Sequence, residues 1–311
     1  MAEIIIGGVL LLTAVSILIF ACSNRVKRRE YTLMSGKISE EITLAHISDL
    51  HESTFGKRQC ELIAEVAEIK PDLIFITGDI IEDDEASITE GKVINENNPA
   101  RIILEALPQI APCYMVFGNH ESNLPNTDAL CEMLESFGVH VLHANNPVTK
   151  GMSREVIIKN QRLFICGADD PVLDKSEHTR KKTLIERFTE DKNKQSPLIK
   201  AWRERLTDEY SKIADEERLT LLLSHRPEEY ELYEKLGFDA AFSGHAHGGQ
   251  WRLPPFINGV YAPHQGLFPS HAGGCYRYDG FAHIVSRGLS KKRMVRIFNR
   301  PEICEVKFVK K

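Results

Sequence analysis

The first half of the chain alternates between short apolar runs and amphipathic segments. Four runs have the length and composition of buried strands: Ile42–Ser48, Leu73–Thr77, Cys113–Phe117 and Val139–Leu142. Between them lie three segments with apolar residues at helical spacing: Lys57–Ile69, Arg101–Leu107 and Thr127–Phe137. Because strands that alternate with helices are typical of α/β proteins, this pattern predicts a mostly parallel sheet. The runs are apolar throughout, which predicts that both faces of the sheet are covered.

The second half continues the strand pattern around a long charged stretch. Three further runs are predicted strands: Leu163–Ile165, Leu219–Leu223 and Asp239–Ser243. Residues 172–218 are dense in Lys, Glu, Asp and Arg, with apolar residues such as Trp202 and Leu206 at helical spacing. This pattern indicates one or two amphipathic helices on the surface, either as a solvated insertion or as a lid or membrane-facing cap.

The first 24 residues have a different pattern. Residues 4–22 carry no charge, and as a helix they would span roughly 28 Å, close to the hydrocarbon thickness of a bilayer. A cleaved signal peptide would carry positive charge before the apolar run, and only Glu3 is charged there. A lipoprotein signal at Cys22 fits poorly with Phe20. A basic cluster follows the run: Arg25, Lys27, Arg28 and Arg29.

We therefore expect an uncleaved transmembrane anchor over residues 1–24, a basic juxtamembrane linker over residues 25–40 and one domain over residues 41–311. The positive-inside rule places this domain on the cytoplasmic side of the cell membrane. The seven cysteines agree with a reducing compartment, because their number is odd and no Cys-x-x-Cys pair occurs.

Composition limits the size and the partners of the protein. A chain of 311 residues with 42% hydrophobic residues can bury the core of one large α/β domain or two small ones. The net charge is -5, so no overall basic field attracts a nucleic-acid polymer, and none is expected as a partner. The oligomeric state is left open.

Polar clusters follow five of the predicted strands. They are Asp49-Leu50-His51, Gly78-Asp79, Gly118-Asn119-His120-Glu121, Ser224-His225 and Gly244-His245-Ala246-His247. Each cluster alone is weak evidence for a metal site, since a single His after a strand more often has a structural role than binds a metal. Open α/β sheets build their sites at the carboxyl ends of the strands, so we expect the five clusters to converge.

The combined donor set suits divalent transition metals. Two Asp, one Asn and four His offer oxygen and nitrogen ligands without a thiolate, which favours Mn, Fe, Zn or Co. A carboxylate can bridge two such ions, and two ions about 3.5–4 Å apart can clamp a phosphoryl oxygen. Gly78, Gly118 and Gly244 precede the ligands, where a tight turn needs a residue without Cβ.

The five clusters resemble the five motifs of the calcineurin-like metallophosphoesterase superfamily, from about residue 40 to the C-terminus. Longer pieces are similar to the YkuE/YaeI-like membrane-associated phosphodiesterase subgroup: Ile47–His51, Leu223–Pro227, Gly244–Gln250, Val285–Leu289 and Asn299–Glu302. Ala246 departs from the motif, where Thr or Ser is common. The resemblance implies a four-layer α/β/β/α sandwich with the site at the sheet edge.

The resemblance also implies a role for each ligand. The first metal would be held by Asp49, His51, Asp79 and His247. The second metal would be held by Asp79, Asn119, His225 and His245, so that Asp79 bridges the two ions. A hydroxide between the metals would attack phosphorus in line. His120 would be catalytic without binding metal, because it would stabilise or protonate the leaving oxygen.

A carboxylate orients this His in related enzymes. The candidates in this chain are Glu82, Asp83 and Glu121, and the sequence leaves the choice open. Asp169 and Asp170 follow a predicted strand and also resemble the subgroup, although a turn favours Asp for structural reasons as well. The remaining histidines have no partner motif and receive no role: His46, His140, His143, His178, His264, His271 and His283.

The predicted activity is metal-dependent hydrolysis of a phosphodiester or pyrophosphate bond. The expected anchor favours a substrate at the bilayer, such as a lipid-linked sugar diphosphate. A cytoplasmic nucleotide or cyclic-nucleotide phosphodiesterase is the alternative, and a non-catalytic metal-binding scaffold is a minor one. Arg252, Arg287 and Arg300 are candidate substrate-binding residues, with ordinary surface or fold-closing roles as the alternative.

Overall fold

The computed structural model describes residues 1–311, with the exception of 83–93, 150, 172–196, 215–216 and 293–294. The side chains of residues 2–4 and 14 are also excluded. One six-stranded sheet has the order β1-β14-β2-β3-β4-β5. Its strands are β1 (Lys27–Ser35), β2 (Ile42–Ile47), β3 (Leu73–Ile76), β4 (Cys113–Met115), β5 (Val139–Val141) and β14 (Glu302–Lys310).

A second six-stranded sheet has the order β12-β13-β9-β8-β7-β6. Its strands are β6 (Ser153–Ile158), β7 (Gln161–Ala168), β8 (Leu219–Ser224), β9 (Ala240–Ser243), β12 (Gly274–Arg277) and β13 (Ala282–Val285). A short hairpin joins β10 (Tyr261–Ala262) to β11 (Gly266–Leu267). The described helices of the domain are α2 (Cys60–Ile69), α3 (Pro99–Ala106), α4 (Asn119–Ser122), α5 (Thr127–Phe137), α8 (Pro197–Tyr210) and α9 (Tyr230–Leu236).

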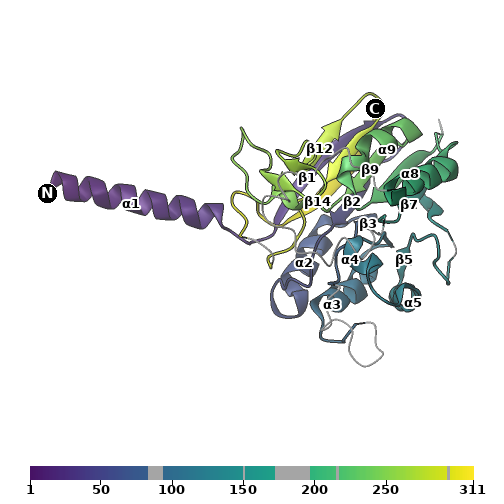
Figure 1. The fold of residues 1–311 in the computed structure, drawn as a ribbon, viewed down its shortest axis with the longest axis horizontal. Coiled ribbons are helices and arrows are strands. Elements are labelled where there is room, and N and C mark those ends of the chain that lie inside the picture. Colours follow the sequence, from purple (N-terminus) through teal and green to yellow (C-terminus); the bar gives the residue numbers. More distant parts are fainter. Residues whose placement is uncertain (83–93, 150, 172–196, 215–216, 293–294) are drawn as a thin grey trace.

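Three apolar clusters separate four layers (Figure 1). The cluster between the sheets includes Phe75 and Phe242, whose rings meet edge to face at 5.0 Å. A second cluster packs α2, α3 and α5 on the first sheet, and a third packs α8 and α9 on the other. The mixed α/β fold expected from the sequence is thus confirmed. Strands β2, β3, β8 and β9 are buried along their whole length, because both faces of each sheet are covered.

Residues 27–35 were expected to form part of a polar linker, and this expectation is wrong because they form β1. This strand pairs in parallel with β14, from Lys27 opposite Glu302 to Ser35 opposite Lys310. Arg28 bonds Glu305, and the Arg29 Nε lies 2.9 Å from the Glu302 Oε2. The basic residues that made the segment look like a linker therefore neutralise acidic residues of its partner strand.

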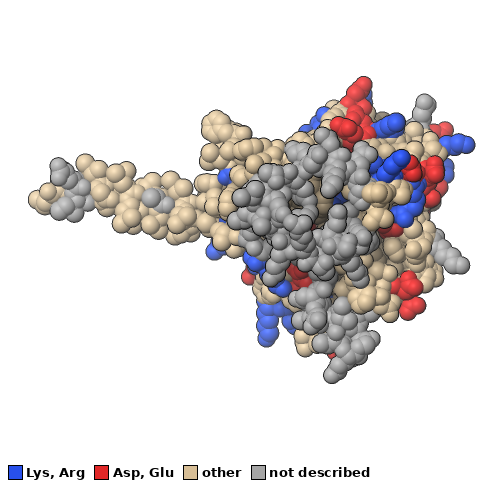
Figure 2. All heavy atoms as spheres, viewed as in Figure 1, with Lys and Arg blue, Asp and Glu red and all other residues tan. Residues whose placement is uncertain are grey.

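Helix α1 (Ala2–Ala21) projects away from both sheets (Figure 1), and Figure 2 shows no acidic or basic colour along its described part. Its apolar side chains are exposed, with Leu10 at 65%, Leu12 at 69% and Phe20 at 66%. Among the described residues, no helix has both the length and the apolar character needed to cross a membrane. The transmembrane anchor expected over residues 1–24 is therefore not supported by the described part of the chain.

Most of the charged stretch at 172–218 lies outside the described residues. Its described part is mainly α8, which buries Trp202, Leu206 and Tyr210 against the second sheet. The Trp202 Nε1 donates to the Asp169 carbonyl, and the Tyr210 hydroxyl donates to the Gly167 carbonyl at 2.7 Å. This part of the stretch is therefore a covering helix of the domain.

Glu302, at the start of β14, carries a buried charge that several cations balance. The Arg287 Nη1 lies 2.6 Å from its Oε2, and the Arg287 backbone N–H donates to its Oε1 at 2.9 Å. Burial by itself would raise the pKa of the Glu302 carboxyl, but the charge and hydrogen bonds of Arg287 outweigh burial and hold this pKa below its ordinary value. The ion pair therefore depends on Glu302 staying ionised.

Replacing Glu302 by Gln should lower the free energy of unfolding by about 3 kcal/mol, because Arg287 would stay buried without a charged partner. Urea unfolding at neutral pH measures this loss. In the unchanged protein the stabilisation is complete above the ordinary carboxyl pKa, and it is lost as the pH falls through the lower folded-state pKa of Glu302.

The matched control for this prediction is Glu204→Gln, which removes an exposed partner of Lys200 on α8 and should change stability little. Equal losses in the two variants would contradict the prediction.

Candidate metal centre

The five polar clusters come together where strands of both sheets end. β2, β3 and β4 are parallel neighbours, and the loops after them carry Asp49 with His51, Asp79, and Asn119. In the other sheet β8 and β9 are also parallel, and they are followed by His225 and by His245 with His247. The sequence prediction that these residues converge agrees with this arrangement, and their roles as ligands stay predictions.

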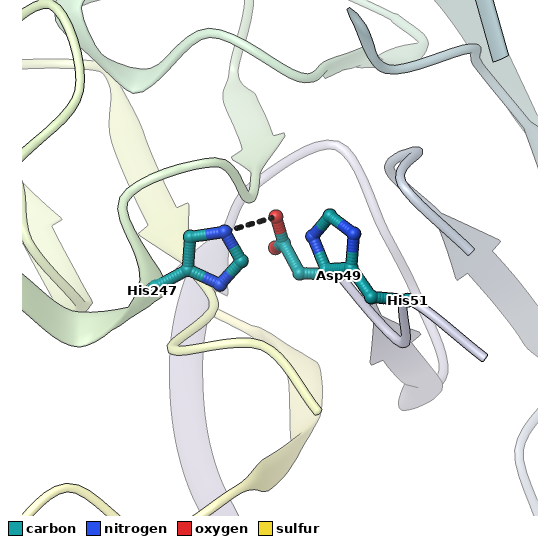
Figure 3. Close-up of side chains that lie close together, drawn as sticks. All are labelled: Asp49, His51 and His247. Atoms are coloured by element: carbon teal, nitrogen blue, oxygen red, sulfur yellow. Dashed lines mark ion pairs between the residues drawn. The ribbon is translucent and has the colours of Figure 1, made fainter. Parts of the chain in front are cut away.

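The first group consists of Asp49, His51 and His247, all buried, with one ligand atom of each within 4.8 Å of the others. The His247 Nε2 lies 3.7 Å from the Asp49 Oδ1, and Figure 3 shows the two imidazoles on either side of the carboxylate. The group therefore offers two nitrogens and one carboxylate to a common point.

The second group consists of Asp79, His225 and His245 within the same 4.8 Å limit. The His225 Nε2 lies 3.1 Å from the Asp79 Oδ2 and 3.0 Å from the His245 Nδ1. The His225 Nδ1 lies 2.7 Å from the Thr77 carbonyl oxygen, which fixes the ring so that Nε2 faces the group.

Asp79 belongs to both groups by position. Its Oδ2 is 3.1 Å from the His225 Nε2 and 3.7 Å from the His51 Nε2. Its Oδ1 accepts the His120 backbone N–H at 3.0 Å, so this oxygen is held in place by the backbone. One carboxylate thus faces imidazoles from both donor groups.

Five of the predicted ligands have a left-handed backbone: Asp49 at φ 51, His51 at 45, Asp79 at 53, His245 at 64 and His247 at 48. Residues with a Cβ rarely adopt this conformation, and each instance costs on the order of 1 kcal/mol. Such strain persists where the surroundings impose it, and it concentrates at functional sites. In this protein, the left-handed conformation directs the side chains of these five residues into the site from the ends of the strands.

Two glycines allow the strand-end loops of the site to pack closely. A Cβ on Gly244 would lie 1.9 Å from the Ser48 Oγ and 2.4 Å from the Asp49 Oδ2. Gly78 has φ +81, and a Cβ there would lie 2.2 Å from the Gly118 backbone nitrogen. Gly244 is thus required by close packing, whereas Gly78 is required by both packing and backbone conformation.

Glu121 holds the turn after β3 to the turn after β4. Its carboxylate accepts backbone N–H groups from Asp79 at 2.8 Å, Ile80 at 2.8 Å, Ile81 at 3.0 Å and Gly118 at 3.0 Å. Both oxygens are therefore engaged by the backbone, which makes Glu121 a scaffold residue for Asp79. Glu121 was one of the three candidates for orienting His120. Its two oxygens instead accept backbone N–H groups, so these hydrogen bonds do not support that role.

Glu82 lies against the His120 ring. Its Oε2 is 3.3 Å from the His120 Nδ1, and its Oε1 is 3.0 Å from the His51 Nδ1. One carboxylate therefore contacts a predicted ligand and the predicted catalytic histidine together. The third candidate, Asp83, lies outside the described residues.

The donor atoms fit divalent cations. The Asn119 Oδ1 and the His51 Nε2 are buried, and within the described part of the chain neither has a hydrogen-bond partner. Burial lowers the pKa of His225, but Asp79 outweighs burial and raises this pKa to about 10. The group thus favours positive charge between these side chains, which a bound cation would supply.

His264 lies beside the second group, although no sequence motif pointed to it. The β10–β11 hairpin brings its Nδ1 to 2.9 Å from the His245 Nε2 and 2.7 Å from the Arg226 Nη1. Arg226 is buried and binds Asp170 through two nitrogens, which gives Asp170, the second residue of the Asp pair after β7, a structural role. No local pattern could have placed His264 here, because the contact depends on the path of a long loop.

The three candidate substrate-binding arginines bond the protein itself. Arg287 binds Glu302 and the Gly273 carbonyl, while Arg252 donates to the Asn258 carbonyl at 2.7 Å and to its Oδ1 at 2.8 Å. Arg300 donates to the Arg25 and Val26 carbonyls. These contacts match the fold-closing alternative, and a substrate role stays a prediction.

If Asp79 serves both donor groups, single substitutions should remove different amounts of metal. After incubation with Mn²⁺ and gel filtration, we expect about two ions per unchanged chain, about one for His247→Ala or His245→Ala, and fewer for Asp79→Ala. Elemental analysis measures the bound metal. His140→Ala is the matched control, because His140 is 43% exposed and pairs with Glu135. Equal loss in His140→Ala and Asp79→Ala would contradict this assignment.

Comparison with known proteins shows the family of this chain. The family model for calcineurin-like phosphoesterases matches residues 42–249, which contain all seven predicted ligands. The uncharacterized metallophosphoesterase YkuE of Bacillus subtilis is 25% identical over 287 residues, covering 90% of this chain and 84% of YkuE. The phosphodiesterase YaeI of Escherichia coli is 24% identical over 268 residues, covering 85% of this chain and 80% of YaeI.

A shorter similarity involves the UDP-2,3-diacylglucosamine pyrophosphatase LpxG of Chlamydia muridarum, which is 35% identical over 89 residues and 27% of each chain. The match of the family model covers about two thirds of the chain and includes the strand-end clusters. The chain belongs to the calcineurin-like phosphoesterase family and is a metal-dependent hydrolase of phosphate esters.

Proposed function

We propose that this protein uses a dinuclear metal site to cleave a phosphodiester or pyrophosphate bond in a membrane-associated substrate, such as a lipid-linked sugar diphosphate. The observation that carries the proposal is the position of Asp79, whose Oδ2 faces both His51 and His225. Two bound divalent ions supply Lewis acidity and a nucleophilic water at neutral pH.

The residues of the chain divide into two donor sets under this proposal. Asp49, His51, Asp79 and His247 would hold one ion, and Asp79, Asn119, His225 and His245 would hold the other. The left-handed backbone at five of these residues fixes their directions before a substrate arrives. Such preorganisation lowers the cost of orienting the site during the reaction.

His120 would assist departure of the leaving oxygen. Its Nδ1 faces the Glu82 Oε2, so a proton on Nδ1 is stabilised by a carboxylate and exchange with a leaving oxygen would take place at Nε2. The His51 and His120 rings lie edge to face with centroids 4.9 Å apart. This contact places His120 next to the donor set without making it a ligand.

The substrate class is supported by α1 and by one relative. The exposed apolar side chains of α1 favour an apolar environment, and the similarity to LpxG suggests a diacylated sugar nucleotide. Seven free cysteines and the basic residues after α1 support a cytoplasmic position of the domain. The proposed location is therefore the cytoplasmic face of a cell membrane.

Glu82→Gln should lower kcat by about 10–100-fold, because the neutral amide would support neither the His120 nor the His51 ring as a carboxylate does. It should also weaken metal binding at the His51 set. The matched control is Glu52→Gln, since Glu52 follows His51 directly but accepts from the Asn98 side chain at 2.7 Å. Hydrolysis of bis(p-nitrophenyl) phosphate measures both variants, and the proton-transfer assignment fails if they behave alike.

The substrate proposal is tested with the full chain in detergent micelles and added Mn²⁺. The substrates are bis(p-nitrophenyl) phosphate, p-nitrophenyl phosphate, cyclic AMP and micellar UDP-2,3-diacylglucosamine. Preferred cleavage of the diacyl substrate is the expected result. Cleavage of nucleotides alone would favour the cytoplasmic nucleotide phosphodiesterase, and unchanged hydrolysis in Asn119→Ala and His120→Ala would overturn the enzymatic role of this site.

A further inference from the structure

Exposed apolar side chains gather on one surface of the domain. Outside α1 and its preceding residue Met1, ten large apolar residues are exposed in the described part of the chain, and six of them belong to one surface. We call it the Trp251 surface, and it consists of Trp251, Leu253, Phe256, Leu267, Phe268 and Val295. The other four, Met34, Val148, Ile157 and Leu198, lie in separate elements and need no special explanation.

Backbone contacts join the members of this surface. The Trp251 Nε1 donates to the Val295 carbonyl at 3.0 Å, and Leu253 forms a bridge with Ile257 next to Phe256. The Val260 N–H donates to the Trp251 carbonyl, and the Phe268 N–H donates to the Val260 carbonyl. The exposed side chains are therefore presented by connected segments with fixed geometry.

The Trp251 surface is continuous with α1. Trp251 pairs with Ile297, and the next residue, Phe298, donates its N–H to the Ala21 carbonyl at 2.7 Å. The Phe298 ring lies 6.5 Å from the Phe20 ring at the end of α1. Figure 1 shows α1 leaving the domain on the side where these late loops lie. An apolar environment that receives α1 would therefore meet this surface.

Basic residues border the same region. Arg25 is exposed between α1 and β1, Lys27 is exposed at the start of β1, and Arg300 donates to the Arg25 carbonyl. Arg252 directly follows Trp251 in the sequence, and its guanidinium donates to Asn258. Aromatic side chains bordered by Lys and Arg are the composition that suits the headgroup level of an anionic bilayer.

The surface is also close to the metal centre along the chain. Trp251 comes four residues after His247, and the Asn299 side chain holds the carbonyls of both His247 and Gln250, at 2.7 and 3.0 Å. His264, which contacts His245, lies in the loop between β10 and β11, and Leu267 and Phe268 come at the end of β11 and directly after it. A lipid surface at Trp251 would therefore bring phosphate headgroups near the predicted ligands.

We propose that the Trp251 surface seats the domain on an anionic lipid bilayer, as a contact additional to α1. The proposal extends the function proposed above to a lipid-facing surface and can be tested without a substrate. Phe256 is 84% exposed and Phe268 66% exposed, so both would enter the interface. Trp251 is 43% exposed and reports on it, whereas Trp202 is buried and serves as an internal reference.

The test reconstitutes the full chain in phosphatidylcholine vesicles with about one-third phosphatidylglycerol. Brominated lipid should quench Trp251 emission, and vesicles should shield Trp251 from acrylamide. The double variant Phe256→Ser with Phe268→Ser should reduce the population that contacts the bilayer through this surface by about tenfold or more, since withdrawing even one phenyl group costs at least the free energy that a factor of ten represents. Trp251→Phe gives the Trp202 background.

The matched control is Ile157→Ser, which removes an equally exposed apolar side chain from β6 and should leave quenching unchanged. Absence of bromolipid quenching in the unchanged chain would overturn the proposal. Shielding of Trp251 that depends on protein concentration without lipid would also overturn it, because a second copy would then cover the surface. Neither result would affect hydrolysis of soluble phosphodiesters, so failure here is distinct from failure of the proposed function.

Discussion

The repulsion between two buried carboxylates, Asp49 and Asp79, is the constraint around which the rest of the structure is arranged. Burial raises the pKa of Asp49, His225 lowers it, and the charge of Asp79 raises it further. Backbone N–H groups of His120 and His245 bind the two side chains. His51 from the first sheet and His225 and His247 from the second face them. The sandwich architecture meets this constraint, because the two sheets end at one edge and together supply these donors from rigid positions.

The sequence predicted the parts of the fold and site that are encoded locally. Apolar runs of strand length end directly in polar clusters, so strand positions and the direction of the following side chains can be inferred together. The ends of α5 were also predictable, since Asn126 accepts the Ala129 N–H and Gly138 adopts the left-handed conformation that terminates the helix. The convergence of the clusters followed from parallel pairing, which places successive strand ends at one edge.

Features that depend on distant partners were not predictable. β1 could not be predicted from the sequence, because its partner strand β14 lies about 275 residues away. The acidic partners of its arginines, Glu302 and Glu305, belong to β14 and give no signal near β1. Among the acidic residues near His120, only three-dimensional contacts separate Glu82 from Glu121, because the latter is engaged by four backbone N–H groups. His264 reaches the site through a hairpin of two-residue strands, which periodicity cannot detect.

The pairing of β1 with β14 sets the mechanical relation between α1 and the catalytic domain. Only residues 22–26 connect the end of α1 to β1, and a fully extended chain of this length reaches at most about 17 Å. Arg300 and Phe298 bind this connection through the Arg25 and Ala21 carbonyls, which shortens the reach further. The base of α1 is therefore held close to the start of β1, so that α1 and the domain can change their relative position only over a short distance.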